Sequence, residues 1–169
     1  YQPLEKRYLI TRRCLEILVE HGFPLLIVTK SDLVTRDIDI LKQTRAVVSM
    51  TITTPHDDVA KTVEPHASPP DARFSALQEV ADGGIPTVVR IDPIIPTLNS
   101  DSKDLEAIVS RAADIGVKQI TASTMKIVRG LLASLKATNP ELSERLASIY
   151  SNGEWISGYK YLTRDKRLK

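Results

Sequence analysis

The sequence predicts an α/β fold in which parallel strands are covered by helices. Short runs rich in β-branched residues alternate along the chain with longer segments whose apolar residues recur at helical spacing. The strand runs are almost continuously apolar, which is typical of strands buried in a parallel sheet. Glycine or proline marks most of the boundaries between these segments. Four such strands fit part of a (β/α) barrel or a small doubly wound sheet, and the pattern alone does not choose between them.

The first helix is expected over residues 5–21, where Ile10, Cys14, Ile17, Leu18 and His21 recur on one face. On this face Cys14 is expected to be a small core residue. The glycine at position 22 suits the left-handed cap that ends many helices. The apolar run over 25–29 predicts the first buried strand, and the spacing over 33–43 predicts a second helix.

The run over 46–52 predicts the second strand, because it is apolar and rich in β-branched residues. Thr54 and Pro55 then resemble a helix start, with a hydroxyl cap and proline at the first position, and this helix ends near Val63. Ser68 to Asp71 open the next helix by the same logic, and the glycine pair at 83–84 ends it. Residues 86–92 predict the third strand.

The amphipathic segment over 101–115 predicts a helix, and Gly116 suits its cap. Residues 117–122 predict the fourth strand. Two helices follow, over about 125–137 and 140–150, the second with Asn139 as its cap and Pro140 at its first position. A short strand is expected within 156–162, and the whole of 1–169 is expected to form a single domain.

Composition sets limits on function. The net charge of +2 is too small to indicate a nucleic-acid-binding protein from bulk charge. No stretch approaches the length of apolar chain that crosses a membrane. The single cysteine excludes a disulfide within the chain, so a cytoplasmic location is the default expectation. Neither Cys14 nor the three histidines, His21, His56 and His66, show metal-ligand spacing, and none is expected to bind a metal.

Basic and aromatic residues are crowded at the C-terminal end. These residues are Tyr159, Lys160, Tyr161, Arg164, Lys166, Arg167 and Lys169. Two interpretations stay open, a solvated tail and a patch that contacts the phosphates of a nucleic acid.

Polar residues follow the predicted strands, where the working surface of a parallel α/β fold lies. Lys30 follows the first strand, Thr51 and Thr53 end the second, and Asp92 ends the third. An ammonium group, hydroxyls and a carboxylate at one rim suit a small polar or anionic ligand. Each of these side chains also has a structural explanation, such as solvation or the capping of a helix.

A second pair, Glu64 and Arg73, flanks a proline-rich loop. We expect a charge-assisted bond between them that closes this loop, which is a structural role. The sequence contains no glycine-rich phosphate loop and no nucleophile elbow. The residues alone therefore predict an α/β domain with a polar strand-end rim.

The order and spacing of several segments resemble the radical S-adenosylmethionine (SAM) family, in particular relatives of spore photoproduct lyase that are described as DNA-photolyase-related. The segments are Tyr1-Gln2-Pro3-Leu4-Glu5, Gly22-Phe23-Pro24 leading into Thr29-Lys30-Ser31-Asp32, Thr51-Ile52-Thr53-Thr54, Glu64-Pro65-His66-Ala67-Ser68-Pro69, Arg73, Gly84-Ile85-Pro86, Asp92-Pro93-Ile94-Ile95-Pro96 and Gly158-Tyr159-Lys160-Tyr161. No single motif is specific, but together their order and spacing are.

The resemblance implies a partial (β/α) TIM-type barrel with a C-terminal helical extension. It also implies a lyase-like radical SAM enzyme that binds a [4Fe–4S] cluster and SAM, cleaves SAM reductively with an external electron donor, and abstracts hydrogen from a substrate through a 5′-deoxyadenosyl radical. Lys30 and Thr51 match SAM-contacting positions, Thr53 lies on the same face, and Asp92 stands where a relative has alanine. DNA repair is an expectation by analogy with those relatives.

One departure is the missing C-x-x-x-C-x-x-C loop that binds the cluster in this family. Either the chain is the middle and C-terminal part of a longer enzyme, which we expect, or it is a degenerate relative without a cluster. In both cases we expect that it does not cleave SAM by itself. Two other functions remain as alternatives. One is a barrel lyase that uses Lys30 as a Schiff-base nucleophile. The other is a non-catalytic nucleic-acid-binding module that uses the basic C-terminal segment.

Overall fold

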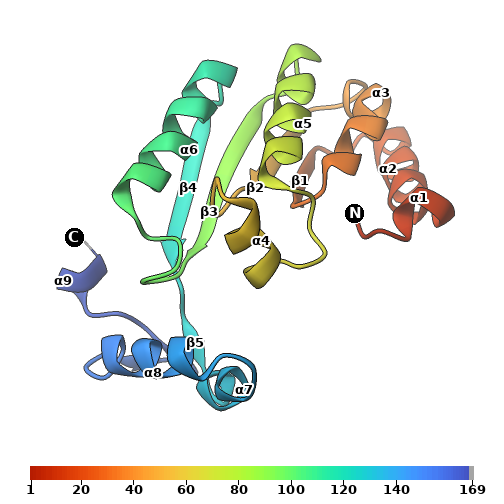
Figure 1. Cartoon of the computed structure of the whole chain (residues 1–169). Coiled ribbons are helices and arrows are strands. Elements are labelled where there is room, and N and C mark those ends of the chain that lie inside the picture. Colours follow the sequence, from red (N-terminus) through yellow and green to blue (C-terminus); the bar gives the residue numbers. More distant parts are fainter. Residues whose placement is uncertain (168–169) are drawn as a thin grey trace.

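A computed structural model describes residues 1–167 of the chain, and Lys169 of the basic segment lies outside the described residues. Its centre is a four-stranded parallel sheet in the sequential order β1-β2-β3-β4. The strands are β1 (Leu25–Thr29), β2 (Ala46–Thr51), β3 (Thr87–Ile94) and β4 (Gln119–Thr124). Helices α5 (Pro70–Asp82) and α6 (Ser102–Ile115) lie over the same face of this sheet (Figure 1).

This arrangement decides between the two folds that the sequence left open. A doubly wound sheet reverses its strand order and carries helices on both faces. Here the order is sequential and the helices pack on one face, as in a segment of a (β/α) barrel. The chain is thus a mixed α/β fold with a partial TIM-type barrel.

The hydrophobic core lies between the sheet and its helices. The strand side chains on this side are Leu25, Ala46, Val48, Met50, Val89 and Ile91. Phe74, Leu77 and Val80 of α5 and Ile108 of α6 pack against them. On the opposite face, which we call the open face, the side chains of Leu26 and Val28 in β1 are 66% and 55% exposed, while Ser49 and Thr51 in β2 are buried. The apolar core thus lies on one face of the sheet, and the other is partly exposed.

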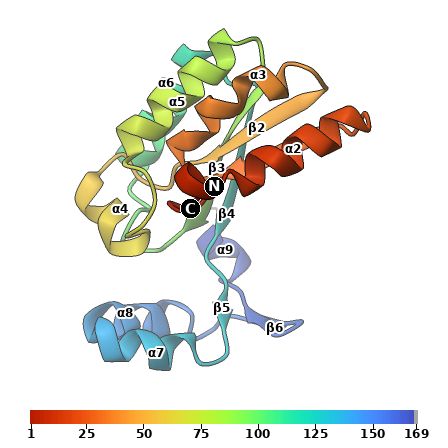
Figure 2. The same cartoon turned by 90° about the vertical axis from the view of Figure 1, so that its right-hand side faces the viewer.

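The N-terminal segment differs from the single helix predicted over 5–21. Leu9 adopts a left-handed backbone conformation (φ 55°) and separates α1 (Glu5–Tyr8) from α2 (Ile10–Glu20). The carboxylate of Glu5 accepts hydrogen bonds from the backbone and hydroxyl of Thr11, which fixes this break. The helices α2 and α3 (Ile38–Leu41) are in contact near the edge of the sheet formed by β1 (Figure 1), and Figure 2 shows α2 running apart from α5 and α6.

The predicted buried face of this helix was also wrong. Leu15 and Val19 pack into the core, whereas Cys14 is exposed. Ile10 and Ile17 are 61% and 57% exposed. Apolar residues lie on more than one face of α2. The face that packs into the core is the one next to the predicted face.

Two further local predictions need correction. The predicted helix over 33–43 is a 3₁₀ helix, η1 (Asp32–Asp37), followed by the short α3, and Ser31 caps η1 by accepting from the Leu33 amide at 3.2 Å. Thr54 does not cap α4 (Asp57–Val63): its hydroxyl accepts from the His56 amide, so it closes a turn before the helix. Gly116 takes the left-handed cap of α6 as predicted, with φ at 81°.

A second layer follows the carboxyl end of β4 (Figure 1). It contains β5 (Ile127–Val128), α7 (Leu131–Thr138), α8 (Pro140–Ile149), β6 (Trp155–Ile156), β7 (Tyr159–Lys160) and α9 (Arg164–Arg167). The strands form an antiparallel sheet in the order β5-β7-β6. This layer has a core of its own around Ile127, Leu146, Tyr150 and Leu162. The predicted helix over 125–137 therefore begins only at Leu131, and the strand predicted within 156–162 is a hairpin.

Candidate functional site

The register of β1 and β2 places Lys30 and Thr51 on the same open face of the sheet. Thr29 lies opposite Met50, so the next residues along these parallel strands, Lys30 and Thr51, are also neighbours. Thr51 in turn lies opposite Arg90 of β3. We call the strand-end positions Lys30, Thr51, Thr53 and Asp92 the rim. They lie at the carboxyl ends of the strands, which point toward the second layer (Figure 1).

Glu64 connects two rim residues. Its Oε1 accepts from the Thr53 hydroxyl at 3.2 Å and lies 3.2 Å from the Lys30 ammonium nitrogen. Its Oε2 accepts from Arg73 Nη1 at 2.6 Å. The side chain of Glu64 is only 6% exposed, while that of Lys30 is 42% exposed. This Glu64 cluster thus presents one accessible ammonium group backed by a buried carboxylate.

Arg73 is the largest fully buried side chain within residues 1–167, and it holds the buried side of the Glu64 cluster in place. It donates from Nη1 to the Thr51 carbonyl at 3.0 Å and from Nε to the Ser68 carbonyl at 2.6 Å. The predicted bond between Glu64 and Arg73 is confirmed, and it joins the proline-rich loop to α5. The Nη2 atom of Arg73 is buried and has no hydrogen-bond partner among the described residues. An unpaired buried donor is costly, so a ligand or water at this point would be stabilised.

Asp92 belongs to a second group on the open face. It pairs with Arg90, and its Oδ1 accepts from the Ser123 hydroxyl at 2.6 Å. Lys30, the cation of the rim, pairs with Glu64 instead. The four rim residues are therefore organised as two groups, one around Glu64 and one around Asp92, with Thr51 on the strand between them.

Asn99 is a site-forming residue for which sequence reasoning gave no role. It is 1% exposed, and its Nδ2 donates to the Thr53 carbonyl at 2.8 Å and to the Pro93 carbonyl at 3.1 Å. Its Oδ1 accepts from the Ile95 amide at 2.5 Å. These bonds hold the loop after β3 against the end of β2. In the sequence, the one sign of this role is that Asn99, an amide residue, follows a proline-rich loop.

A buried ionic network, also missed, fastens the N-terminal segment to η1. Asp37 is fully buried and accepts from Tyr1, Arg12 and Arg36 at 2.8 to 3.0 Å. Burial opposes its charge, but the hydrogen bonds from Arg36 and Tyr1 outweigh this, so the pKa of Asp37 lies below its ordinary value. Burial and the bond to Asp37 raise the pKa of Tyr1. We call this network the N-terminal clamp.

The cavities do not all lie near the rim. A cavity of about 840 Å³ lies at the amino ends of the strands and is lined mainly by apolar residues such as Leu25, Leu26 and Leu41. A cavity of about 330 Å³ lies beside the carboxyl ends of β3 and β4. Its lining residues are Ile94, Ala122, Ser123, Thr124, Lys126, Tyr161 and Arg167. The rim residues thus lie at the end of the sheet opposite to the cavity of about 840 Å³.

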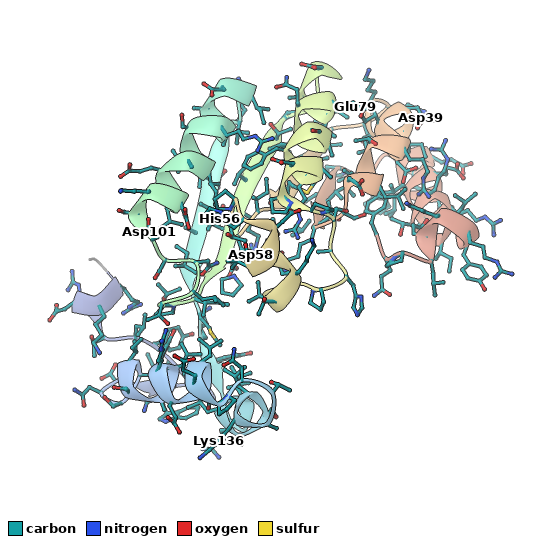
Figure 3. The ribbon with its side chains drawn as sticks, viewed as in Figure 1. Asp39, His56, Asp58, Glu79, Asp101 and Lys136 are labelled. Atoms are coloured by element: carbon teal, nitrogen blue, oxygen red, sulfur yellow. The ribbon has the colours of Figure 1, made fainter. Side chains whose placement is uncertain are left out.

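The residues of this chain do not supply a site for an iron–sulfur cluster. Such clusters are held by several cysteine thiolates, and the one cysteine, Cys14, is exposed on α2. Within residues 1–167 no three His, Cys, Asp or Glu side chains are grouped so that they could hold a metal ion. His56 instead contacts Asp104 of α6 at 2.8 Å, between α4 and α6 (Figure 3).

Part of the basic C-terminal segment has structural contacts. Lys160 donates to the Ser151 carbonyl at 3.1 Å and Lys166 to the Ile149 carbonyl at 2.8 Å. Arg164 and Arg167 are exposed. Neither the solvated-tail nor the phosphate-contacting interpretation is tested by these contacts. In the part of the chain described, no helix has the length and apolar character needed to cross a membrane.

No protein-family model matches the chain. Among curated proteins, the uncharacterized protein ORF301 of Acidianus two-tailed virus is 32% identical over 160 residues, which cover 88% of this chain and 53% of that protein. The uncharacterized protein Rv2578c of Mycobacterium tuberculosis is 24% identical over 98% of this chain and 52% of its own length. The chain thus spans about half the length of these relatives.

Solved structures share the fold at low sequence identity. A spore photoproduct lyase variant with bound AdoMet and dinucleoside spore photoproduct matches with a TM-score of 0.70 and 16% identity, over 96% of this chain and 50% of that one. Streptococcus suis SuiB bound to S-adenosylmethionine matches with a TM-score of 0.58 and 13% identity, over 84% of this chain and 33% of that one. The fold of this chain is therefore that of proteins solved with SAM, including one of the kind that the sequence resembles.

Proposed function

We propose that this chain is the SAM-binding part of a radical SAM enzyme, with the rim residues Lys30, Thr51, Thr53 and Asp92 around the cofactor. The observation that carries the proposal is the Glu64 cluster, which sets Lys30 and Thr53 together at the carboxyl ends of a partial barrel. The shared fold with SAM-bound proteins supports the choice of cofactor.

The rim offers groups that fit SAM. The methionyl part of SAM carries both an ammonium and a carboxylate, and its ribose carries two hydroxyls. Lys30 is a donor suited to a carboxylate, while Asp92 is an acceptor suited to an ammonium or to hydroxyls. When bound beside a [4Fe–4S] cluster, SAM supplies a radical that abstracts hydrogen from substrate.

The chain's own residues bind and orient the cofactor in this proposal. Lys30 anchors the carboxylate, and its ion pair with Glu64 restricts the position of the lysine side chain. Asn99 holds the loop after β3 over Thr53 and limits the access of water to that end of the rim. The cluster ligands are not among these residues, so the hydrogen abstraction, the substrate and the electron donor belong to the proposal for the whole enzyme.

A titration of the full chain with SAM tests the proposal without any need for turnover. Backbone amide NMR signals near Lys30, Thr51 and Thr53 are expected to shift saturably with millimolar SAM. Lys30→Met is expected to weaken binding by about tenfold or more, because it removes a charge-assisted hydrogen bond. Lys42→Met, at the amino ends of the strands, is the matched control and should leave the affinity unchanged. Equal affinity in both variants would contradict the proposal.

The contacts of Lys30 also bear on the Schiff-base alternative. A lysine that attacks a carbonyl presents an unpaired amine, whereas Lys30 is held 3.2 Å from the Glu64 carboxylate. This ion pair supports a binding role over a nucleophilic one. Borohydride trapping with a carbonyl substrate, followed by mass analysis for an adduct on Lys30, distinguishes the two functions.

A further inference from the structure

The cavity of about 330 Å³ beside the ends of β3 and β4 has a chemistry of its own, and we call it the junction pocket. It lies where β4 runs into β5 with only Met125 and Lys126 between them. Cavities of this size hold small ligands or parts of larger ones. It shares no lining residue with the Glu64 cluster.

The register of the antiparallel sheet fixes two of its lining residues. Ile127 lies opposite Lys160 and Val128 opposite Tyr159, so Lys126 lies opposite Tyr161. The Lys126 ammonium is accordingly 5.5 Å from the centre of the Tyr161 ring. The buried neighbour Leu162 anchors this part of the chain in the second core. Strand pairing and an aromatic contact therefore restrain the position of Lys126.

The charge of the junction pocket is uncompensated. Lys126 and Arg167 line it, and no acidic side chain does. Neither cation forms an ion pair with a carboxylate of residues 1–167. Thr124 and Tyr161 add hydroxyl groups to the polar lining, while the hydroxyl of Ser123, which also lines the pocket, already donates its hydrogen to Asp92. Such a set contains donors for several oxygens of one anion.

We propose that the junction pocket binds a phosphate group of the substrate. An arginine fork, a lysine ammonium and hydroxyls suit a phosphate, whose oxygens accept from several directions, better than a flat carboxylate, which one arginine already satisfies. Ser123 links this pocket to the rim, because it lines the pocket and donates to Asp92 at 2.6 Å. The assignment of this phosphate to a substrate rests on the proposed function. In that proposal SAM lies beside Asp92, so a ligand in the adjoining junction pocket would lie next to the cofactor.

The test is an NMR titration of the full chain with inorganic phosphate, phenyl phosphate and acetate at matched ionic strength. Both phosphates are expected to shift the amide signals of residues 122–126 and 161 saturably, and acetate is not. The double variant Lys126→Gln/Arg167→Gln is expected to weaken phosphate binding by about tenfold, because it removes two charge-assisted contacts. Both residues are exposed, so the variant should fold.

The charge-matched control is Lys118→Gln/Lys136→Gln. Lys118 precedes the amino end of β4, and Lys136 points away from the sheet at the far side of α7 (Figure 3). This control should bind phosphate as the unaltered chain does. An equal response to acetate, or unchanged affinity in Lys126→Gln/Arg167→Gln, would overturn the proposal. Binding of inorganic phosphate without phenyl phosphate would overturn its assignment to a substrate.

A parallel SAM titration separates this inference from the proposed function. Lys126→Gln/Arg167→Gln should bind SAM unchanged, because neither residue belongs to the rim. Phosphate binding without SAM binding in the unaltered chain would leave the anion pocket in place and refute the cofactor proposal. SAM binding without phosphate binding would support the cofactor proposal and refute the anion pocket.

Discussion

Replacing Glu64 with glutamine should destabilise the chain far more than the same replacement on the surface. The Glu64 side chain is 6% exposed, forms ion pairs with Lys30 and Arg73, and accepts a hydrogen bond from Thr53. The Arg73 side chain is 1% exposed. Removing one member of a buried ion pair costs ~3–5 kcal/mol, because the remaining charge is left unpaired away from water. The amide of the new side chain keeps one acceptor oxygen, so we expect Glu64→Gln to cost about 3 kcal/mol.

Urea unfolding followed by circular dichroism measures this loss. With a slope of about 2 kcal/mol per molar urea, a loss of about 3 kcal/mol lowers the midpoint by about 1.5 M. Glu141→Gln is the matched control, because Glu141 also pairs with an arginine but its side chain is 75% exposed. Exposed pairs contribute less than about 1 kcal/mol. Equal shifts in the two variants would refute the view that Arg73 depends on Glu64 for its burial.

Two pH-dependent predictions follow from buried groups. The lowered pKa of Asp37 stabilises the fold above its unfolded pKa of about 4, and this contribution is lost as the pH falls further. The stability deficit of Asp37→Asn should therefore be large at pH 7 and shrink in urea titrations below pH 4, whereas a constant deficit would contradict it. Burial raises the pKa of Tyr150 to about 12. Its contribution of about 2 to 3 kcal/mol is then present below pH 10 and lost as the pH rises toward 12, a decline that Tyr150→Phe should lack.

The strands were the most predictable part of the fold. The first strand matches its predicted bounds, and the others lie within about two residues of theirs, because continuous β-branched runs between glycine and proline leave little choice. The carboxyl ends of parallel strands meet at one edge, and this rule predicts from the sequence that Lys30, Thr51, Thr53 and Asp92 share a rim. The bond between Glu64 and Arg73 followed from their position around one loop.

What the sequence did not predict depends on contacts between distant segments. The break at Leu9 arises because Glu5 bonds to Thr11, which local helix propensity does not contain. Asp37 and Arg12 are 25 positions apart, so no spacing rule pairs them. Helical periodicity likewise could not choose between two adjacent apolar faces of α2, and it placed Cys14 on the wrong one. The continuation of β4 into β5 depends on pairing with β7, which lies more than thirty residues later.

The one-sided packing of the sheet divides the work of each strand between alternate residues. In β2, Val48 and Met50 are committed to the helices, while Ser49 and Thr51 face away from them. Ser49 and Thr51 are nonetheless only 6% and 4% exposed, so larger side chains at either set would meet neighbouring atoms. In the proposed SAM-binding role, a change at Thr51 would therefore alter the free energy of unfolding as well as the affinity for the cofactor.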